Sequence, residues 1–235
     1  MRISIKKPLC IVPARGGSKR LLHKNITMLG GKPLLAWTIE AAVEAEIFDE
    51  VWISSEDQEI LDIAGQWGGK PLLRPVELAG DHVTLVQLCL HVIRNFMDQG
   101  MDYTSFYVLC PTSPFRRSET IQIAWQMFNN SSADSLLSVI PLKHAIHSAM
   151  VQTKDGWLQP LFPIEFELPR QVLVPHYRPD GGHIIVNISE FFKTQAFLGS
   201  RTLAFPVPIE ESVDIDESID ILWAEFLLDK GMVKK

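Results

Sequence analysis

Apolar positions along the first 140 residues form short continuous runs that alternate with stretches of helical spacing. The runs at 9–12, 51–54, 106–109 and 136–140 have the length and the apolar content of buried strands. Between them, apolar residues recur three and four positions apart, most clearly from Leu85 to Phe96. Similar helices are predicted after Pro33, around 60–67, and after Ser118, which is placed to cap its helix. The pattern predicts an α/β fold with a mostly parallel sheet covered by helices on both faces.

The regular alternation stops at about residue 141 and resumes at about residue 180. This stretch contains six prolines and scattered aromatic residues, which is too apolar for a disordered linker and too broken for strand–helix units. We expect an insertion, 141–180, that packs against a second subunit. Further strands are predicted at 183–188 and 203–207. The last element is an amphipathic helix whose core face is predicted to hold Ile219, Leu222, Trp223, Phe226 and Leu227.

Length and composition restrict the class of protein. With 235 residues and 46% hydrophobic content, the chain fits one domain, or one domain that carries an insertion. A net charge of −6 argues against a broad nucleic-acid surface. The three cysteines, Cys10, Cys89 and Cys110, lack metal-type spacing and lie in apolar runs, which is typical of reduced core thiols in a cytoplasmic protein. The sequence shows neither a signal peptide nor a membrane span.

A cation-rich loop with two glycines follows the first predicted strand. Gly16 and Gly17 allow the backbone to turn tightly, and Arg15, Lys19 and Lys24 supply positive charge, so the loop is suited to phosphate groups. It matches neither the P-loop nor the dinucleotide-binding pattern. An ordinary basic surface turn remains the alternative.

Two carboxylates, Asp214 and Asp216, stand two residues apart on a predicted extended segment. Such residues point to the same side, so both side chains can face one hard cation. The alternative is that Asp216 caps the last helix while Asp214 is merely solvated.

Three predicted turns follow parallel strands, and ligands collect at that edge of an open sheet. They are the loop at Arg15, the turn 54–57, and the turn 111–114, after which Arg116 follows. In the last of these, two prolines fix a rigid turn that leaves the hydroxyls of Thr112 and Ser113 and the guanidinium of Arg116 facing the cleft, which suits a polar, anionic ligand.

Five motifs in order resemble the CMP-sialic acid synthetase (acylneuraminate cytidylyltransferase) family. The Lys24-Asn25 ending of the first motif is more similar to this group than to its Kdo-activating relatives. The matching segments are 11–25, 74–81, 111–116, 169–171 with 177–181, and 212–216.

The resemblance implies a three-layer Rossmann-like nucleotidyltransferase fold. The implied reaction joins CTP to an acidic nine-carbon (nonulosonic) sugar, releases pyrophosphate, and uses Mg²⁺ or Mn²⁺ in a cytoplasmic homodimer. Two rivals remain: a cytidylyltransferase for Kdo or another 3-deoxy-2-keto acid, and a nucleotide-binding regulator without turnover.

The resemblance also implies roles for individual residues. Arg15 and Lys24 are expected to stabilise phosphate charge, and Asp214 and Asp216 to hold the metal. The residues expected around CTP are Ala14, Arg15, Gly16, Gly17, Ser18, Lys19, Lys24, Asn25, Arg74, Asp81 and Thr84. The residues expected around the sugar are Thr112, Ser113, Arg116, Arg170, Gln171, Arg178 and Asp180.

Some of these roles are more specific. Arg74 is expected near the cytosine, and Asp81 and Thr84 beside the base and ribose; a turn with Asp81 as helix N-cap is the alternative. Arg170 is expected to reach the neighbouring subunit's cleft, and Arg178 to bind the sugar carboxylate within its own subunit.

The chain departs from the family pattern on the expected sugar side. Cys110 replaces a glutamine, Ser148 a common lysine, and Ile184 a tyrosine, while Asp180 and Gly182 also differ from the usual run. These departures imply an acid sugar other than N-acetylneuraminic acid. No side chain stands out as the general base. The seven histidines are assigned to the surface and to packing within the insert, and the tryptophans to the core.

Overall fold

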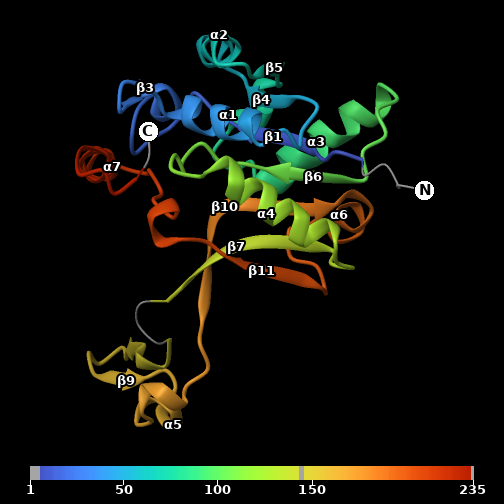
Figure 1. Cartoon of the computed structure of the whole chain (residues 1–235). Helices are drawn as coiled ribbons and strands as arrows, with labels where there is room; N and C mark the ends of the chain where they lie inside the picture. The colour runs from blue at the N-terminus through green and yellow to red at the C-terminus, as the bar shows by residue number, and fades with distance from the viewer. Residues whose placement is uncertain (1–5, 143–145, 234–235) are drawn as a thin grey trace.

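The computed structural model describes residues 6–142 and 146–233, apart from the side chain of Arg170, and it is built around one seven-stranded sheet (Figure 1). The strand order is β11-β7-β10-β6-β1-β4-β5. Strand β10 pairs antiparallel with β6 and β7, and the other pairs are parallel. The predicted mostly parallel sheet is confirmed. The strands are β1 (Leu9–Pro13), β4 (Val51–Ser55), β5 (Lys70–Leu73), β6 (Ser105–Val108), β7 (Ser135–Pro141), β10 (Tyr177–Asn187) and β11 (Thr202–Pro206).

Helices cover both faces of this sheet, as predicted. Alternate residues of β1 point to opposite faces, so Cys10 and Val12 join one apolar core and Leu9 and Ile11 join the other. The first core is completed by α1 (Leu34–Glu44), α2 (Gln58–Gln66) and α4 (Ser118–Asn129), and the second by α3 (Leu85–Asp98) and α6 (Ile188–Thr194). Ser118 is the first residue of α4 and not its N-cap, a position that Arg117 occupies without a side-chain cap.

The closing helix α7 (Ser218–Asp229) forms as predicted, but with a different face toward the core. Ala224, Leu227 and Leu228 are buried in a third cluster with residues of α1 and the short strand β2 (Met28–Leu29), which pairs with β3 (Lys32–Pro33). Four of the five residues predicted to face inward are exposed instead, at 45–65%: Ile219, Leu222, Trp223 and Phe226. The helix is apolar on two sides, so periodicity alone could not choose the buried one.

Between β7 and β10, the segment of residues 146–176 stands away from the main sheet (Figure 1). It contains the hairpin of β8 (Met150–Gln152) and β9 (Leu158–Pro160) and the short helix α5 (Pro163–Phe166). Strand β10 already begins at Tyr177, before the predicted end of the insertion at residue 180. Its pairing with β7 shifts register between Pro179 and Ile184.

Four assignments of single residues are wrong. His183 is buried in the sheet, where its Nδ1 lies 2.6 Å from the hydroxyl of Tyr107, so it belongs neither to the surface nor to the insert. Trp157 and Trp223 are exposed and are not core residues. Cys110 is only partly buried, because it borders the cavity described below.

Candidate functional site

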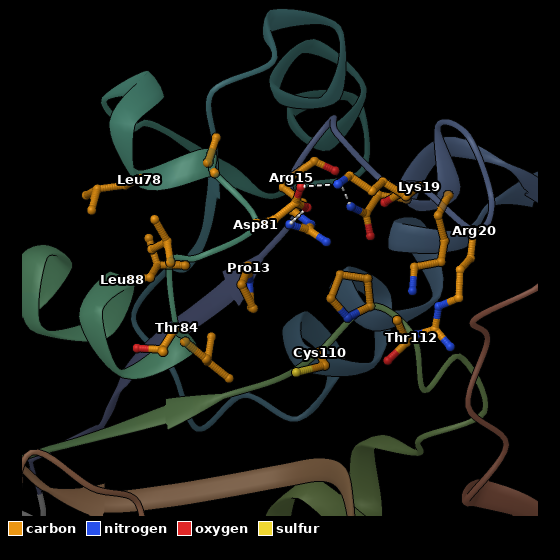
Figure 2. A pocket seen from close by; sticks show the side chains of 18 of the residues that line it. Pro13, Arg15, Lys19, Arg20, Leu78, Asp81, Thr84, Leu88, Cys110 and Thr112 are labelled. Atoms are coloured by element: carbon orange, nitrogen blue, oxygen red, sulfur yellow. Dashed lines mark hydrogen bonds and ion pairs between the residues drawn. The ribbon is translucent and has the colours of Figure 1, made fainter.

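A cavity of about 550 Å³ lies at the carboxyl ends of β1 and β6. Its walls come from the loop after β1, the segment that leads into α3, the turn after β6, and the segment before α7. Figure 2 shows Arg15, Lys19 and Asp81 together on one side of it, with Cys110 and Thr112 opposite. The predicted site residues that line the cavity are Arg15, Ser18, Lys19, Lys24, Asn25, Arg74, Asp81, Thr84, Thr112 and Asp216.

The loop after β1 is held by hydrogen bonds within the loop and to residues at and after the end of β4. Asn25 is buried and donates from Nδ2 to the carbonyl of Arg15 (2.8 Å), while the Ala14 amide binds the Ser54 carbonyl (3.0 Å). The Ser18 amide donates to the Gly16 carbonyl (2.9 Å), and the Gly16 amide to the carboxylate of Glu56 (2.8 Å). Three loop amides, those of Ala14, Gly16 and Ser18, therefore already bind protein oxygens, and the loop presents its charge to the cavity mainly through side chains.

Only one of the two glycines is needed for space. A Cβ on Gly16 would lie 2.6 Å from Oδ2 of Asp57, whereas a Cβ on Gly17 would meet open space. Asp57 is the N-cap of α2 and accepts a hydrogen bond from Glu59. The loop therefore packs directly against the start of α2, and a Cβ at position 16 would have to displace the Asp57 side chain.

Arg74 is held by a carboxylate that the sequence analysis did not single out. Glu56 accepts from Nε and Nη2 of Arg74 at 3.0 and 2.7 Å, and the two side chains are only 14% and 4% exposed. Burial raises the pKa of Glu56, but the hydrogen bonds from Arg74 and the backbone outweigh it, so the net pKa is lowered. The available signal was the position of Glu56 in the turn after β4, beside the loop after β1.

Four cations around the cavity form two groups, each held by one aspartate. Asp81 bridges Arg15 (3.1 Å) and Lys19 (2.6 Å). Asp216 bridges Lys24 (2.9 Å) and Arg20 (2.7 Å), the second being a residue that the sequence analysis missed. Hydrogen bonds from Lys19 and Lys24 lower the pKa of Asp81 and Asp216 respectively, so both carboxylates are ionised at neutral pH. Asp81 does not cap a helix, because Thr84 is the N-cap of α3.

Asp214 lies beside the cavity rather than in its lining. The pKa of Asp214 is raised, mainly by burial. A hydrogen bond with Thr112 opposes this rise, and the nearby carboxylate of Asp216 increases it. Within residues 6–142 and 146–233, no group of three or more His, Cys, Asp or Glu side chains is arranged to hold a metal. Two neighbouring carboxylates nevertheless fit Mg²⁺, which is commonly held by one or two carboxylates and by substrate phosphates.

Several residues expected around the sugar do not reach the cavity. Ser113 is buried in its turn. Arg116 is 4% exposed and donates to Thr38 (3.1 Å) and to the Cys110 carbonyl (3.0 Å); it borders a second cavity, of about 420 Å³. Asp180 is buried and accepts from Ser138 and from the Gly182 amide, and Ile184 is a core residue. The prediction that Arg116 faces the cleft is therefore wrong: the turn directs this side chain inward.

The remaining predicted residues lie outside the cavity lining. Gln171 is exposed in the insert, and Arg178 is exposed near the start of β10. The side chain of Arg170 lies outside the described residues. Ala14, Gly16 and Gly17 shape the backbone next to the cavity. Among the helices of the described chain, none is both long enough and apolar enough to span a membrane.

Comparison with known proteins identifies the family. The model of the cytidylyltransferase family matches residues 9–155. A CMP-N,N'-diacetyllegionaminic acid synthase from Legionella pneumophila is 31% identical over 94% of this chain and 96% of its own length. An N-acylneuraminate cytidylyltransferase from Escherichia coli is 33% identical over 91% of this chain, but the match spans 50% of that protein; matches in Streptococcus agalactiae are similarly partial.

Solved structures show the same fold. A CMP:2-keto-3-deoxy-manno-octonic acid synthetase complexed with CTP superposes with a TM-score of 0.69 at 16% identity, over 96% of this chain and all of that one. A 4-diphosphocytidyl-2C-methyl-D-erythritol synthase from Anaerococcus prevotii gives 0.66 at 12% identity, over 95% of this chain and 96% of that one. The family match over residues 9–155 and the 31% identity to the Legionella pneumophila synthase over most of both chains show that this chain belongs to the cytidylyltransferase family.

Proposed function

We propose that the chain transfers the cytidylyl group of CTP to a nonulosonic acid, giving a CMP-sugar and pyrophosphate. The observation that carries the proposal is the cavity itself, in which four cations, held in two groups by Asp81 and Asp216, surround a space at the carboxyl end of the sheet. The relatives named for N-acylneuraminic, legionaminic and pseudaminic acids support this substrate class.

In this proposal the triphosphate lies against the loop after β1. Arg15 and Lys24 contact phosphate oxygens and stabilise the negative charge that builds up when the anomeric hydroxyl of the sugar attacks the α-phosphorus in line. Thr84 and the N–H groups of Arg74 that Glu56 leaves free face the nucleoside. Asp214 and Asp216 would hold a divalent cation, Mg²⁺ first, which neutralises phosphate oxygens and the departing pyrophosphate when bound.

The sugar is proposed to bind at Thr112 and Cys110, across the cavity from Arg15. Of the family departures noted above, Cys110 lines the cavity, whereas Asp180 and Ile184 are buried in the sheet. The expected preference for a sugar other than N-acetylneuraminic acid therefore depends mainly on the loss of a hydrogen-bonding side chain at position 110.

We further propose a single cytidylyltransferase domain over 1–235 that acts as a cytoplasmic homodimer. The insert supplies the contact between subunits, Arg170 extends into the neighbouring cavity, and Arg178 binds the sugar carboxylate. The support for the dimer is the exposed apolar surface of the insert, which includes Trp157 (73%) and Ile164 (80%).

The test is pyrophosphate release from CTP and Mg²⁺ with a panel of N-acetylneuraminic, legionaminic, pseudaminic, Kdn and Kdo acids. We expect release with one or more nonulosonic acids and a lower kcat/KM for Kdo. Arg15→Ala should lower kcat by about two to four orders of magnitude. The matched variant Lys193→Ala, on the surface of α6, should retain activity. A clear preference for Kdo, or no release with any sugar, would contradict the proposal.

A further inference from the structure

Asp81 binds two cations, Arg15 and Lys19, of the loop against which the proposed function places the triphosphate. Its Oδ1 lies 3.1 Å from Nη1 of Arg15, and its Oδ2 lies 2.6 Å from Nζ of Lys19. Both carboxylate oxygens thus bind cations on the loop after β1. Arg15 lies 66 positions before Asp81 in the sequence, so this contact joins distant segments. Figure 2 shows this contact at the cavity wall.

This arrangement is not required for the local fold. Thr84 and Gln87 cap α3 reciprocally. The backbone N–H of Gln87 donates to Oγ1 of Thr84 (3.2 Å), and Oε1 of the Gln87 side chain accepts from the backbone N–H of Thr84 (2.8 Å). The turn before the helix is closed by the Val83 amide and the Gly80 carbonyl (3.0 Å). The Asp81 carboxylate therefore acts across the cavity and not on its own helix.

A carboxylate that bridges two cations with both oxygens uses the same donors that a phosphate group would use. The side chains of Arg15 and Asp81 are about equally accessible, at 41% and 40%, so an incoming anion can reach the pair from solvent. A triphosphate carries more charge than one carboxylate, which allows it to displace Asp81. The like charge of Asp81 must then move away or weaken binding.

We infer that Asp81 occupies the place of a phosphate group and sets the affinity for CTP by competing for Arg15 and Lys19. The inference rests on the proposed function, since it assumes that these cations bind the triphosphate. It assigns Asp81 a role different from a contact with base or ribose: the residue opposes nucleotide binding, and its displacement frees the 80–83 segment from the loop after β1.

The test is calorimetric titration of the full chain with sodium tripolyphosphate, and separately with cytidine, at low ionic strength because salt screens exposed ion pairs. Asp81→Asn should lower the Kd for tripolyphosphate about 3- to 10-fold, the range expected when one exposed competing carboxylate is neutralised. Cytidine binding should not change. The matched variant Glu77→Gln removes the same charge from an exposed residue of the same segment and should alter the Kd by no more than about twofold.

Each other outcome overturns the inference. One such outcome is weaker or unchanged binding of tripolyphosphate by Asp81→Asn. A second is that Glu77→Gln tightens tripolyphosphate binding as much as Asp81→Asn does. A third is weaker binding of cytidine by Asp81→Asn, which would place Asp81 on the nucleoside. Failure of the proposed function is distinguishable, because tripolyphosphate binding involves no sugar and no turnover. Suppose that the wild-type chain makes no CMP-sugar, but that the Asp81→Asn variant binds tripolyphosphate more tightly than the wild type. This result would refute the proposed reaction and would still support competition between Asp81 and phosphate.

Discussion

Glu56 contacts both Arg74 and the loop after β1. One of its oxygens accepts from the Gly16 amide and the other from Arg74, so a single carboxylate fixes the backbone of the loop and the direction of the guanidinium. Because Arg74 is 4% exposed at its side chain, its charge depends on this partner for compensation.

Glu56→Gln should therefore destabilise the fold by about 2–4 kcal/mol, because it leaves a buried guanidinium without its counter-charge. Urea denaturation measures the change. The control is Glu50→Gln, which removes an exposed partner of Lys70 (3.1 Å) and should cost less than about 1 kcal/mol. Equal decreases in the free energy of unfolding for the two variants would show that the Glu56–Arg74 pair stabilises the fold no more than an exposed ion pair does.

At the scale of elements, the loop after β1 and the start of α2 depend on each other's shape. The approach of Gly16 to Asp57 leaves no space for a methyl group, although neither glycine of the loop has a positive φ. The loop backbone is therefore acceptable for alanine at both positions, and the difference between them lies in what a Cβ would contact.

Gly16→Ala should destabilise the protein by about 1–3 kcal/mol, as expected for overpacking, and raise the KM for CTP by displacing the loop. Gly17→Ala, one residue away, should be neutral or stabilising by up to about 1 kcal/mol, because it only restricts the unfolded chain. Thermal unfolding and CTP kinetics on both variants test this. A larger loss for Gly17→Ala would refute the packing argument.

At the scale of the whole molecule, the free energy of unfolding should decrease as the pH is lowered, in part because of His183. Burial lowers the pKa of His183 well below its usual value, and the nearby Arg116 guanidinium adds to the effect. Tyr107 is the ring's hydrogen-bond partner. The unfolded chain gains a proton on this residue below about pH 6.5, while the folded chain keeps the ring neutral, so acid favours unfolding.

Between pH 7 and pH 5, the wild-type free energy of unfolding should fall more steeply than that of His183→Gln, by up to about 1.4 kcal/mol per pH unit. Denaturant titrations at several pH values give the slopes. His82→Gln, which changes an exposed histidine, should keep the wild-type slope. Identical slopes for the wild type and His183→Gln would mean that His183 does not contribute.

Assembly is decided by which exposed apolar surface binds a second copy. We expect sedimentation to show a dimer at micromolar concentration, and Ile164→Glu in the insert to dissociate it, because a charge at such a contact is costly to desolvate. Leu198→Glu, on the body of the protein and 64% exposed, should leave the dimer intact. If Leu222→Glu on α7 dissociates the dimer and Ile164→Glu does not, the interface lies on α7 instead.

The sequence by itself determined the sheet, the helices over its two faces, and the cation-rich loop at the end of β1. These features depend on local periodicity and on residues within one loop, and both are readable without knowing what lies opposite. The candidate cations Arg15, Lys19 and Lys24 were found this way, and the structure places all three around one cavity.

Only the tertiary structure decided which partners those residues have. The pairing of Arg74 with Glu56, the bridge from Asp81 to Arg15, the inward turn of Arg116 and the choice of face on α7 all depend on contacts between distant segments. A carboxylate near a strand end is equally consistent with a cap, a metal ligand or an ion pair until its neighbours in space are known. The physical reason is that charge and burial act through distance in three dimensions, whereas the sequence pattern records only spacing along the chain.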